Sequence, residues 1–567
     1  MPQTYDDLTR DQLVEILKRR DRERKLGLVW ERQEIEADRS INSDFLINEL
    51  DEALSLGGAG RANFIVEADN YDALRWLRTT HRGAIKFIYI DPPYNSGKTA
   101  GKTFVYNDNY VDPNDDYRHS KWLEFMYQRL CLARDLMTPD GLIFVSIDDG
   151  EMARLQLLME IIFPGNFQAC LVWQTDGNSD NTAAFKVQHE YILVYSRDKT
   201  QVLPPPVIDP NIDPDASKLF NNEIRNTFVK NEARKNKPST LTLPAGFPAS
   251  FERGVIPPRS GNQYPNHAEP IIVEDFKVQK SVELYSGWQS KNLFLRFVAQ
   301  EFAPVFDQEQ RLTAFELDKN GAIQSFKPRA ESQSHVISVI KNVGSVQKTK
   351  SDLKKIGITF DYPKPVGLIQ YLLKMMPGND FTVLDFFAGT GTTAEAVERL
   401  NQEDGGTRRW IMVSSTEATA TEPDKNVCRD ACARRLRLFY ETQGMGIRSS
   451  RPESYGFSYD RIRRVRHSDV DEALQPDNAW RWVQYAHGIP PTSYDSNSAV
   501  QQAESANVLV FYVDRATPNA ITETAKRLNG KPAVVYSWTP GRFAEIAAEK
   551  NIDLRPIPAF FADRLSR

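Results

Sequence analysis

The feature that most limits the possible folds is the nearly continuous apolar run AIKFIYI at 84–90, which ends directly in Asp91-Pro92-Pro93-Tyr94. A strand that is apolar on both faces is typical of a parallel sheet covered by helices on both sides. The following sequence alternates between helix and strand patterns, with helices at 122–137 and 151–163 and strands at 142–147, 169–173 and 191–196. This alternation predicts an α/β fold with a doubly wound, Rossmann-like sheet. Thr138–Gly141 is expected to end the first of these helices.

Changes in residue composition and in helix and strand pattern divide the 567 residues into five segments. We expect an N-terminal helical arm at 1–60, a first part of the α/β core at 61–200, an insertion rich in Pro, Asn and Ser at 201–360, a second part of the core at 361–450, and a small C-terminal α/β module at 451–567. The C-terminal module reads as β-α-β-α-β and carries no catalytic motif that we recognise.

Composition and charge exclude several classes of protein. The chain has 71 Lys and Arg against 76 Asp and Glu, a net charge of -5, so any nucleic-acid surface must be a local patch. No segment approaches the roughly 18 consecutive apolar residues of a membrane span, and the charged N-terminus is unlike a signal peptide. The cysteines Cys131, Cys170, Cys428 and Cys432 lack the spacing of a zinc site. We therefore expect a reduced cytoplasmic protein with no metal and no membrane association.

Two clusters of positive charge are candidates for a local patch that contacts phosphates. One comprises the lysines within 341–355, and the other comprises the arginines within 461–466. Each cluster is either a phosphate-binding surface or a solvated charged face, and the second explanation is the more common for a charge run alone.

The motif Asp91-Pro92-Pro93-Tyr94 lies where ligands of open α/β sheets bind, outside the carboxyl end of a strand. The prolines remove two backbone donors and leave carbonyl groups free to accept. The Asp91 carboxylate and the Pro92 carbonyl can each accept one hydrogen of an amino group on an aromatic ring, and Tyr94 offers a face for stacking. These four residues are therefore candidate catalytic residues acting on a base taken out of a duplex. The alternative is a plain strand that ends in a Pro-Pro turn.

A second motif, DFFAGTGTT at 385–393, again follows an apolar strand and precedes a helix, here at 394–400. Gly389 and Gly391 allow a tight turn and a close approach to a ligand, and the helix offers unpaired N–H groups. The loop lacks the GxxxxGK[ST] pattern of a phosphate loop, which argues against ATP. Alone it could be a structural turn. Combined with an amino-group clamp on another strand, it indicates methyl transfer from S-adenosyl-L-methionine.

The two motifs together resemble the β-class of DNA amino-methyltransferases, in which DPPY precedes FxGxG, and especially the modification subunits of type III restriction–modification systems. The resemblance covers about 60–440 and is carried by EADNYDALRWL, IYIDPPYNSGKT with FVYNDNY, LMTPDGLIFVSIDDGE, YPKPVGLIQYLL and DFFAGTGTTAEAV. It implies that 61–200 and 361–450 are the two parts of a methyltransferase core. It also implies that 201–360 is the target-recognition region.

Eight residues are candidates for binding the cofactor: Asp69, Lys364, Asp385, Phe387, Gly389, Gly391, Thr392 and Glu417. The resemblance implies that Lys364 lies near the methionine end of the cofactor and Asp69 near its adenine. Glu417 ends the strand after the second motif, where a carboxylate suits the ribose hydroxyls. Glu422 is a competitor for that role, and an ordinary surface carboxylate is the alternative for Glu417.

The resemblance implies methylation of N6 of adenine in double-stranded DNA, because N4-cytosine enzymes of this class more often carry Ser at the position of Asp91. Methylation of cytosine N4 is the alternative within this chemistry. A DNA-recognition subunit that serves a nuclease or helicase partner is an alternative of another class. A nuclease in the C-terminal module is a third, although we find no PD-(D/E)xK-like arrangement there. We further expect a homodimer and a role in restriction–modification or phage defence.

Overall fold

A computed structural model describes most of the chain as two compact units, Met1–Val207 with Val336–Arg567 (unit 1) and Ile208–His335 (unit 2). The described residues are Thr9, Arg10, Val14, 44–58, 62–95, 118–175, 185–206, 223–229, 237–261, 264–308, 310–328, 336–419, 422–442, 456–505, 508–528, 530–550, 552–557 and 559–566. The FVYNDNY segment at 104–110 and most of the predicted N-terminal arm lie outside them.

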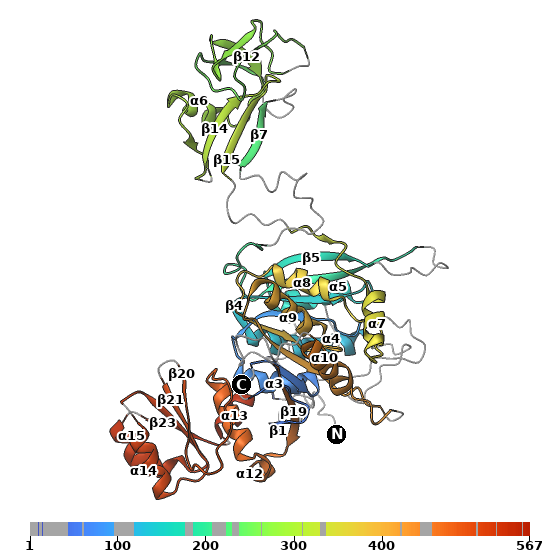
Figure 1. The fold of residues 1–567 in the computed structure, drawn as a ribbon, viewed down its shortest axis with the longest axis vertical. Coiled ribbons are helices and arrows are strands. Elements are labelled where there is room, and N and C mark those ends of the chain that lie inside the picture. Colours follow the sequence, from blue (N-terminus) through green and yellow to red (C-terminus); the bar gives the residue numbers. More distant parts are fainter. Residues whose placement is uncertain are drawn as a thin grey trace. The chain divides into compact units, whose positions relative to one another are not determined.

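Unit 1 is organised around one large mixed sheet (Figure 1). Its strand order is β1 (Phe45–Leu50), β19 (Ser458–Val465), β2 (Phe64–Glu67), β18 (Arg409–Ser414), β17 (Thr382–Asp385), β3 (Ile85–Ile90), β4 (Met137–Ile147), β6 (His189–Ser196), β5 (Phe167–Gln174) and β16 (Val339–Ile340). From β2 to β4 neighbouring strands are parallel, whereas β6 is antiparallel to both β4 and β5.

The central strands are apolar on both faces because helices cover both faces. In β3, Ile88 and Ile90 belong to the core on one face, while Phe87 and Tyr89 belong to the core on the other. The first core includes residues of α3 (Asn70–Thr80), α4 (Arg118–Leu136) and α5 (Met152–Ile162), and the second includes residues of α8 (Val366–Lys374), α9 (Thr392–Asp404) and α10 (Arg434–Thr442). The prediction of a Rossmann-like α/β sheet is confirmed.

The order of the strands creates a switch point between β3 and β17. The chain leaves β3 through α4 to reach β4, and it leaves β17 through α9 to reach β18, on the other side. Ligands of open α/β sheets bind where neighbouring strands feed connections in opposite directions, beyond the carboxyl ends. Because β3 and β17 are paired and parallel, the two sequence motifs follow strand ends at the same edge of the sheet.

Four predicted boundaries need correction. Residues 45–50 of the predicted helical arm form β1, and β19 brings the basic segment after 451 into the main sheet, where it pairs with β1 and β2. Residues 336–360 belong to unit 1, so the insertion that forms unit 2 is narrower than 201–360. Thr138–Gly141 does not separate a helix from a strand, because α4 ends at Leu136 and β4 begins at Met137.

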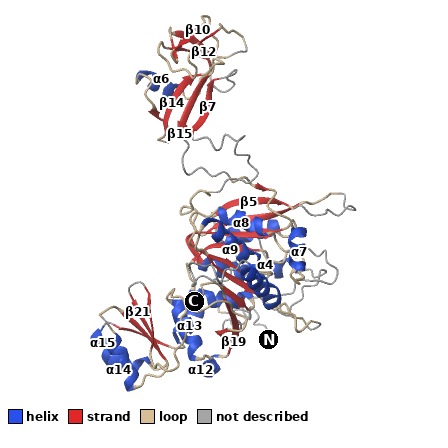
Figure 2. Ribbon diagram, viewed as in Figure 1, coloured by secondary structure: helices blue, strands red, loops and turns tan. Residues whose placement is uncertain are grey.

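Unit 2 has a core of its own, which includes the phenylalanines Phe228, Phe294 and Phe315 beside aliphatic residues. Apart from α6 (Lys291–Ala299), its described elements are strands (Figure 2). Its largest sheet has the order β13 (Val305–Phe306), β14 (Leu312–Leu317), β15 (Ile323–Pro328) and β7 (Glu223–Val229). A separate core is what a region able to fold as its own domain requires.

The C-terminal module is a four-stranded sheet in the order β20 (Gln501–Ser505), β21 (Val508–Val513), β22 (Ala533–Ser537) and β23 (Ile552–Pro556), with helices α14 (Pro518–Arg527) and α15 (Ala544–Lys550). Two further helices, α13 (Pro476–Ala486) and α16 (Ala559–Ser566), attach it to the core. Trp482 of α13 stacks on Phe561 of α16 at 3.9 Å and donates a hydrogen bond to Thr79 of α3. In the described parts of the chain, no helix has both the length and the apolar character that crossing a membrane would require.

Candidate active site

The residues of the first motif directly follow β3. The indole N–H of Trp122, on α4, donates to the Pro93 carbonyl at 2.7 Å and so holds the Pro-Pro turn in place. Pro92 is buried, while Asp91 and Tyr94 are partly buried. Burial raises the pKa of Asp91, although the nearby Lys364 ammonium works in the opposite direction. The turn thus presents a carboxylate and an aromatic ring side by side.

Lys364, from the loop before α8, reaches into this group of residues. Its Nζ lies 3.1 Å from Asp91 Oδ1, 2.7 Å from Tyr94 Oη and 2.7 Å from Glu190 Oε2. Its ammonium also lies 4.8 Å from the centre of the Tyr94 ring, and its side chain is only 6% exposed. Lys364 therefore contacts the DPPY motif itself.

Glu190 completes this cluster and was not among the residues selected from the sequence. Its Oε2 accepts hydrogen bonds from Lys364 and, at 2.9 Å, from Tyr94 Oη. Glu190 lies at the start of β6, and because that strand is antiparallel its first residues meet the carboxyl ends of β3 and β4. The sequence signal was a polar triplet, Gln188-His189-Glu190, directly before an apolar strand.

The second motif begins with Asp385, which stabilises the loop that follows it. Its Oδ1 accepts from the backbone N–H of Phe387 at 3.0 Å, and its Oδ2 accepts from Thr393 Oγ1 at 2.6 Å. Asp385 is buried, and burial raises its pKa to about 7 although these two hydrogen bonds lower it. Both of its oxygens are thus used within the loop, which indicates a supporting role.

Gly389 and Gly391 occupy backbone conformations that favour glycine, with φ of 50° and 75°. A Cβ at Gly389 would lie 3.2 Å from the Phe360 ring, and a Cβ at Gly391 would lie 2.9 Å from Cys432 Sγ. Phe360 and Cys432 therefore pack against the loop too tightly for a larger residue at either glycine position.

Arg435 holds the loop from the side of α10. Thr392 Oγ1 accepts a hydrogen bond from Arg435 Nη1 at 2.8 Å, and Thr390 Oγ1 accepts one from the same atom at 2.9 Å. Arg435 is in turn paired with Glu395 at 2.7 Å. Thr392 is thus engaged within the protein, as Asp385 is.

Asp69 caps the N-terminus of α3 and closely follows β2, the strand that pairs with β18. Its Oδ1 accepts from the backbone of Tyr71 at 2.8 Å, and its carboxylate pairs with Arg129 of α4 at 3.2 Å. The adjacent Asn70 donates to the Phe386 carbonyl at 3.0 Å, so this turn is joined to the second motif. Asp69 consequently lies beside the loop, although its carboxylate already has two partners.

Glu417 follows β18 and is the candidate that is least integrated with the others. It pairs with Lys425 at 3.1 Å, its side chain is 31% exposed, and its φ is 53°. The structure thus brings Asp91, Tyr94 and Lys364 into one cluster and sets the 385–391 loop on the neighbouring strand. It leaves Glu417 at the end of the next strand along.

The arginine cluster contributes mainly to the sheet. Arg461, Arg463 and Arg464 of β19 pair with carboxylates on β1, β2, α3 and the adjoining turn, and Arg466 pairs with Asp469. This pattern favours a charged structural face over a phosphate-binding patch. In the lysine cluster, Lys350 pairs with Asp361 and Lys355 with Asp352 on the surface.

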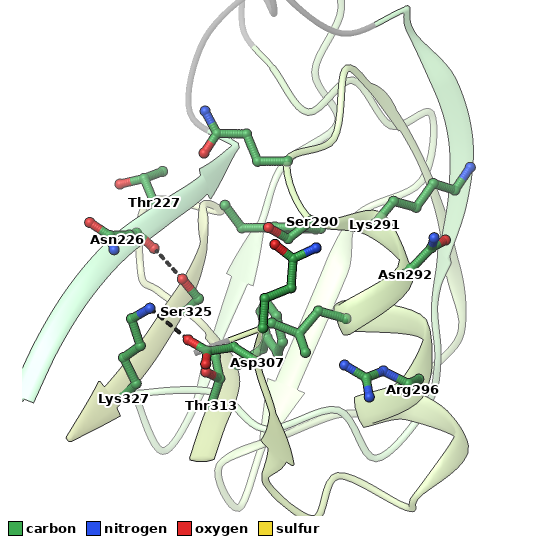
Figure 3. A pocket seen from close by; sticks show the side chains of 15 residues that line it. Asn226, Thr227, Ser290, Lys291, Asn292, Arg296, Asp307, Thr313, Ser325 and Lys327 are labelled. Atoms are coloured by element: carbon green, nitrogen blue, oxygen red, sulfur yellow. Dashed lines mark hydrogen bonds and ion pairs between the residues drawn. The ribbon is translucent and has the colours of Figure 1, made fainter. Parts of the chain in front are cut away.

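Unit 2 carries a separate cavity of about 630 Å³ (Figure 3). Its lining comes from β7 and β15 on one side and from the start of α6 on the other. Most of the lining side chains are polar: Asn226, Thr227, Gln289, Ser290, Lys291, Asn292, Arg296, Asp307, Gln308, Thr313, Ser325 and Lys327. Lys327 is paired with Asp307 at 2.8 Å, whereas Arg296 donates to a backbone carbonyl.

The family model described as DNA methylase matches residues 85–422. The StyLTI Mod subunit of a type III restriction–modification enzyme from Salmonella typhimurium is 31% identical over 385 residues, which is 63% of this chain and 53% of the relative. The EcoPI Mod subunit from Escherichia phage P1 is 31% identical over 398 residues, 63% of this chain and 58% of the relative.

A shorter relative is covered more fully. The type II methyltransferase M.KpnI from Klebsiella pneumoniae is 28% identical over 389 residues, 66% of this chain and 85% of the relative. The chain thus spans little more than half the length of the two Mod subunits.

Proposed function

The chain belongs to the DNA methylase family, and from that premise we propose that it transfers a methyl group from S-adenosyl-L-methionine to N6 of adenine in duplex DNA. The observation that carries the proposal is the pairing of β3 with β17 as parallel neighbours. This pairing sets an amino-group clamp and a glycine loop at one edge of the sheet, although almost three hundred residues separate them in the sequence. Two reactants bound at such neighbouring sites would meet in one place, and positioning of this kind contributes much of an enzyme's rate.

The second motif fits an adenosine-type cofactor. Gly389 and Gly391 bring bare backbone to the end of β17, and α9 follows directly. Glu417, at the end of the next strand, would accept from ribose hydroxyls, while Phe387 would contact the cofactor beside Asp69. Asp385 and Thr392 would act indirectly by holding the loop, because their side chains bond within the protein. When bound, the cofactor supplies a methyl group activated on a cationic sulfur, and its transfer leaves the electron pair on sulfur and a positive charge on the amino nitrogen until one proton is lost to solvent.

The first motif would bind the target base. Asp91 Oδ and the Pro92 carbonyl would accept the two amino hydrogens, and acceptors that are already oriented stabilise the charge that develops on nitrogen. Tyr94 would stack on the base, which contributes about 1–3 kcal/mol for each stacked base. A base in this site must leave the duplex.

Adenine is the proposed target, and cytosine N4 is the competing one. The DNA methylase family model that the chain matches carries both N6 and N4 in its name. Support for adenine comes from Asp91 at the first position of the motif, where the resemblance leads us to expect Ser in many N4-cytosine enzymes. Both targets present an exocyclic amino group, so the same clamp would serve either.

Unit 2 would read the target sequence. Amide side chains such as Asn226 and Asn292 in its cavity can pair with base edges, and cations such as Lys291 and Arg296 can contact phosphates. The similarity to Mod subunits supports a place in a restriction–modification system, with a nuclease or helicase partner. A homodimer in the cytoplasm is also part of this proposal.

Single-molecule sequencing of DNA from cells that express the protein tests the proposal directly. We expect N6-methyladenine at one recurrent sequence, and its loss by at least about 100-fold in an Asp91→Ala variant that still folds, because the main acceptor is removed. Modified cytosine beside unmodified adenine would replace the adenine assignment. Unmodified DNA from cells that contain folded wild-type protein would refute the proposed activity.

A further inference from the structure

Glu190 has no part in the function proposed so far, yet it binds two residues of the site. Its Oε2 lies 2.7 Å from Lys364 Nζ and 2.9 Å from Tyr94 Oη. The same ammonium lies 3.1 Å from Asp91 Oδ1, so one lysine is shared between two carboxylates. Glu190 itself is only 21% exposed.

The charges of this cluster do not balance. Two carboxylates, Asp91 and Glu190, face one ammonium, which leaves one negative charge in excess. Lys364 remains cationic because the two carboxylates raise its pKa above the ordinary value, although burial lowers it. The excess charge is useful only if it is available to the incoming base.

An ammonium beside Asp91 creates a problem for the proposed reaction. It forms an ion pair with Asp91 Oδ1, a buried oxygen that has no hydrogen-bond partner in the described part of the chain and that should accept from the target amino group, and it offsets the charge that should stabilise the methylated nitrogen. In the absence of Glu190, the carboxylate partner left to Lys364 among the residues that the structure describes would be Asp91. A buried pair of that kind is costly to break.

We propose that Glu190 is a positioning residue that holds the Lys364 ammonium when the target base enters, so that Asp91 meets the amino group with its full negative charge. This inference rests on the proposed function of the site. The bond from Tyr94 to Glu190 also fixes the orientation of the ring on which the base would stack. Glu190 would thus act through Lys364 and Tyr94 rather than by touching the base.

The pKa of Asp91 depends on the charged groups that surround it. The titratable groups that face Asp91 are Tyr89 and Tyr94 from its own segment, Asp385 from β17, Glu190 from β6 and Lys364 from the loop before α8. Among them, Glu190 raises the pKa of Asp91 and Lys364 lowers it. Removal of the Glu190 charge should therefore lower the pKa of Asp91.

The experiment compares wild type with Glu190→Gln, Glu190→Asp and the double variant Glu190→Gln/Lys364→Gln, on DNA that contains the methylated sequence. For Glu190→Gln we expect kcat/KM to fall about 10–100-fold, mainly through kcat, with DNA binding in the absence of cofactor changed less than about threefold. The acid limb of the kcat/KM profile should move to lower pH, since that limb reports the free enzyme's essential base.

The other variants separate charge from structure. Glu190→Asp keeps the charge and should keep the acid limb of the kcat/KM profile near its wild-type position. This variant still tests the role of the charge if Glu190→Gln fails to fold. The double variant restores the single negative charge. At saturating S-adenosyl-L-methionine, which offsets any loss of cofactor binding through Lys364, it should be at least about fivefold more active than Glu190→Gln. Glu160→Gln is the matched control, because Glu160 accepts a hydrogen bond from Tyr195 of the same strand β6, in a pair that the site does not include.

Two results would overturn the positioning role: an acid limb that Glu190→Gln leaves in place, or a double variant no more active than Glu190→Gln. A melting temperature shared by Glu190→Gln and Glu160→Gln would show that the loss of activity is not a loss of fold. Failure of the wild-type protein to methylate DNA would instead refute the proposed function.

Discussion

Asp385 shows how a residue can support a site without reaching it. Both of its oxygens accept hydrogen bonds from its own loop, and its side chain is buried. The resemblance placed it among the cofactor-binding residues, whereas its contacts indicate that it holds the loop in shape. Its burial has a consequence for stability, because it raises the pKa to about 7.

An aspartate whose pKa is raised on folding stabilises the protein only while it is protonated. The unfolded chain releases this proton near pH 4 and the folded protein near pH 7, so the contribution is complete below pH 4 and declines as pH rises to 7. The slope is about 1.4 kcal/mol for each pH unit in that window. Asp385→Asn keeps groups that can bond Phe387 and Thr393 but does not titrate.

We therefore expect the free energy of unfolding of Asp385→Asn to increase relative to that of wild type as pH rises from 5 to 7.5, because only the wild-type protein loses stability over that range. Chemical denaturation at several pH values measures this difference. Parallel stability curves for the two proteins would show that Asp385 has the same pKa in the folded and unfolded states.

At the scale of the element, α9 is flanked at each end by a glycine whose backbone lies in the left-handed region. Gly391 precedes it with φ of 75°, and Gly405 follows it with φ of 67°. A Cβ at Gly391 would meet Cys432 Sγ at 2.9 Å, whereas a Cβ at Gly405 has no neighbour within 4 Å. The backbone strain of alanine is thus similar at both ends, but the crowding differs.

Gly405→Ala should lower the free energy of unfolding by about 1 kcal/mol from strain alone. Gly391→Ala should cost about 1–3 kcal/mol more, because overpacking adds to the strain. It should also weaken cofactor binding, which calorimetry measures beside denaturant unfolding. Equal costs for the two variants would mean that the helical segment Cys428–Ala433, which carries Cys432, can move away from the loop.

The elements that the sequence predicted well are those with an unambiguous pattern. The runs before Asp91 and Asp385 are apolar on both faces, and such strands become neighbours in the centre of a covered sheet. Glu190 was missed for a physical reason. The apolar pattern of β6 identifies a strand but not its direction, and only its antiparallel direction brings its polar first residues to the site.

The basic segment at 461–466 illustrates the same limit. Its composition suited either a phosphate contact or a charged face, and the choice depended on partners more than 380 residues away in the sequence. Arg461 pairs with Asp51 and Glu67, and Arg463 with Glu49, because β19 lies between β1 and β2. Long-range strand pairing of this kind leaves no local signal.

At the scale of the whole molecule, the chain forms two units with separate cores, and under the proposed function one would carry the chemistry and the other the recognition of DNA. The methyltransferase sheet is assembled from residues on both sides of the insertion, while unit 2 has its own core. The C-terminal module belongs to unit 1, and its helices α13 and α16 pack against α3. If unit 2 reads the target as proposed, its residues could vary without disturbing the core of unit 1.

If the cavity of unit 2 meets DNA, its cations should carry part of the affinity. We expect the double variant Lys291→Glu/Arg296→Glu to bind duplex DNA at least about tenfold more weakly near physiological salt. The dependence of log K on log salt should become shallower by about two units, since each lost phosphate contact removes roughly 0.9. Fluorescence anisotropy over a range of salt concentrations measures both quantities.

The matched control is Lys277→Glu/Lys319→Glu, which makes the same change of charge on two exposed lysines of unit 2 that do not line the cavity. It should leave the salt dependence close to that of wild type, because a general effect of net charge falls off within a Debye length of about 8–10 Å. An equal loss of affinity in both double variants would assign the effect to the net charge of unit 2. Unchanged binding in Lys291→Glu/Arg296→Glu would exclude this cavity as a DNA contact, and the reading of the target would then have to lie on another face of unit 2 or in unit 1.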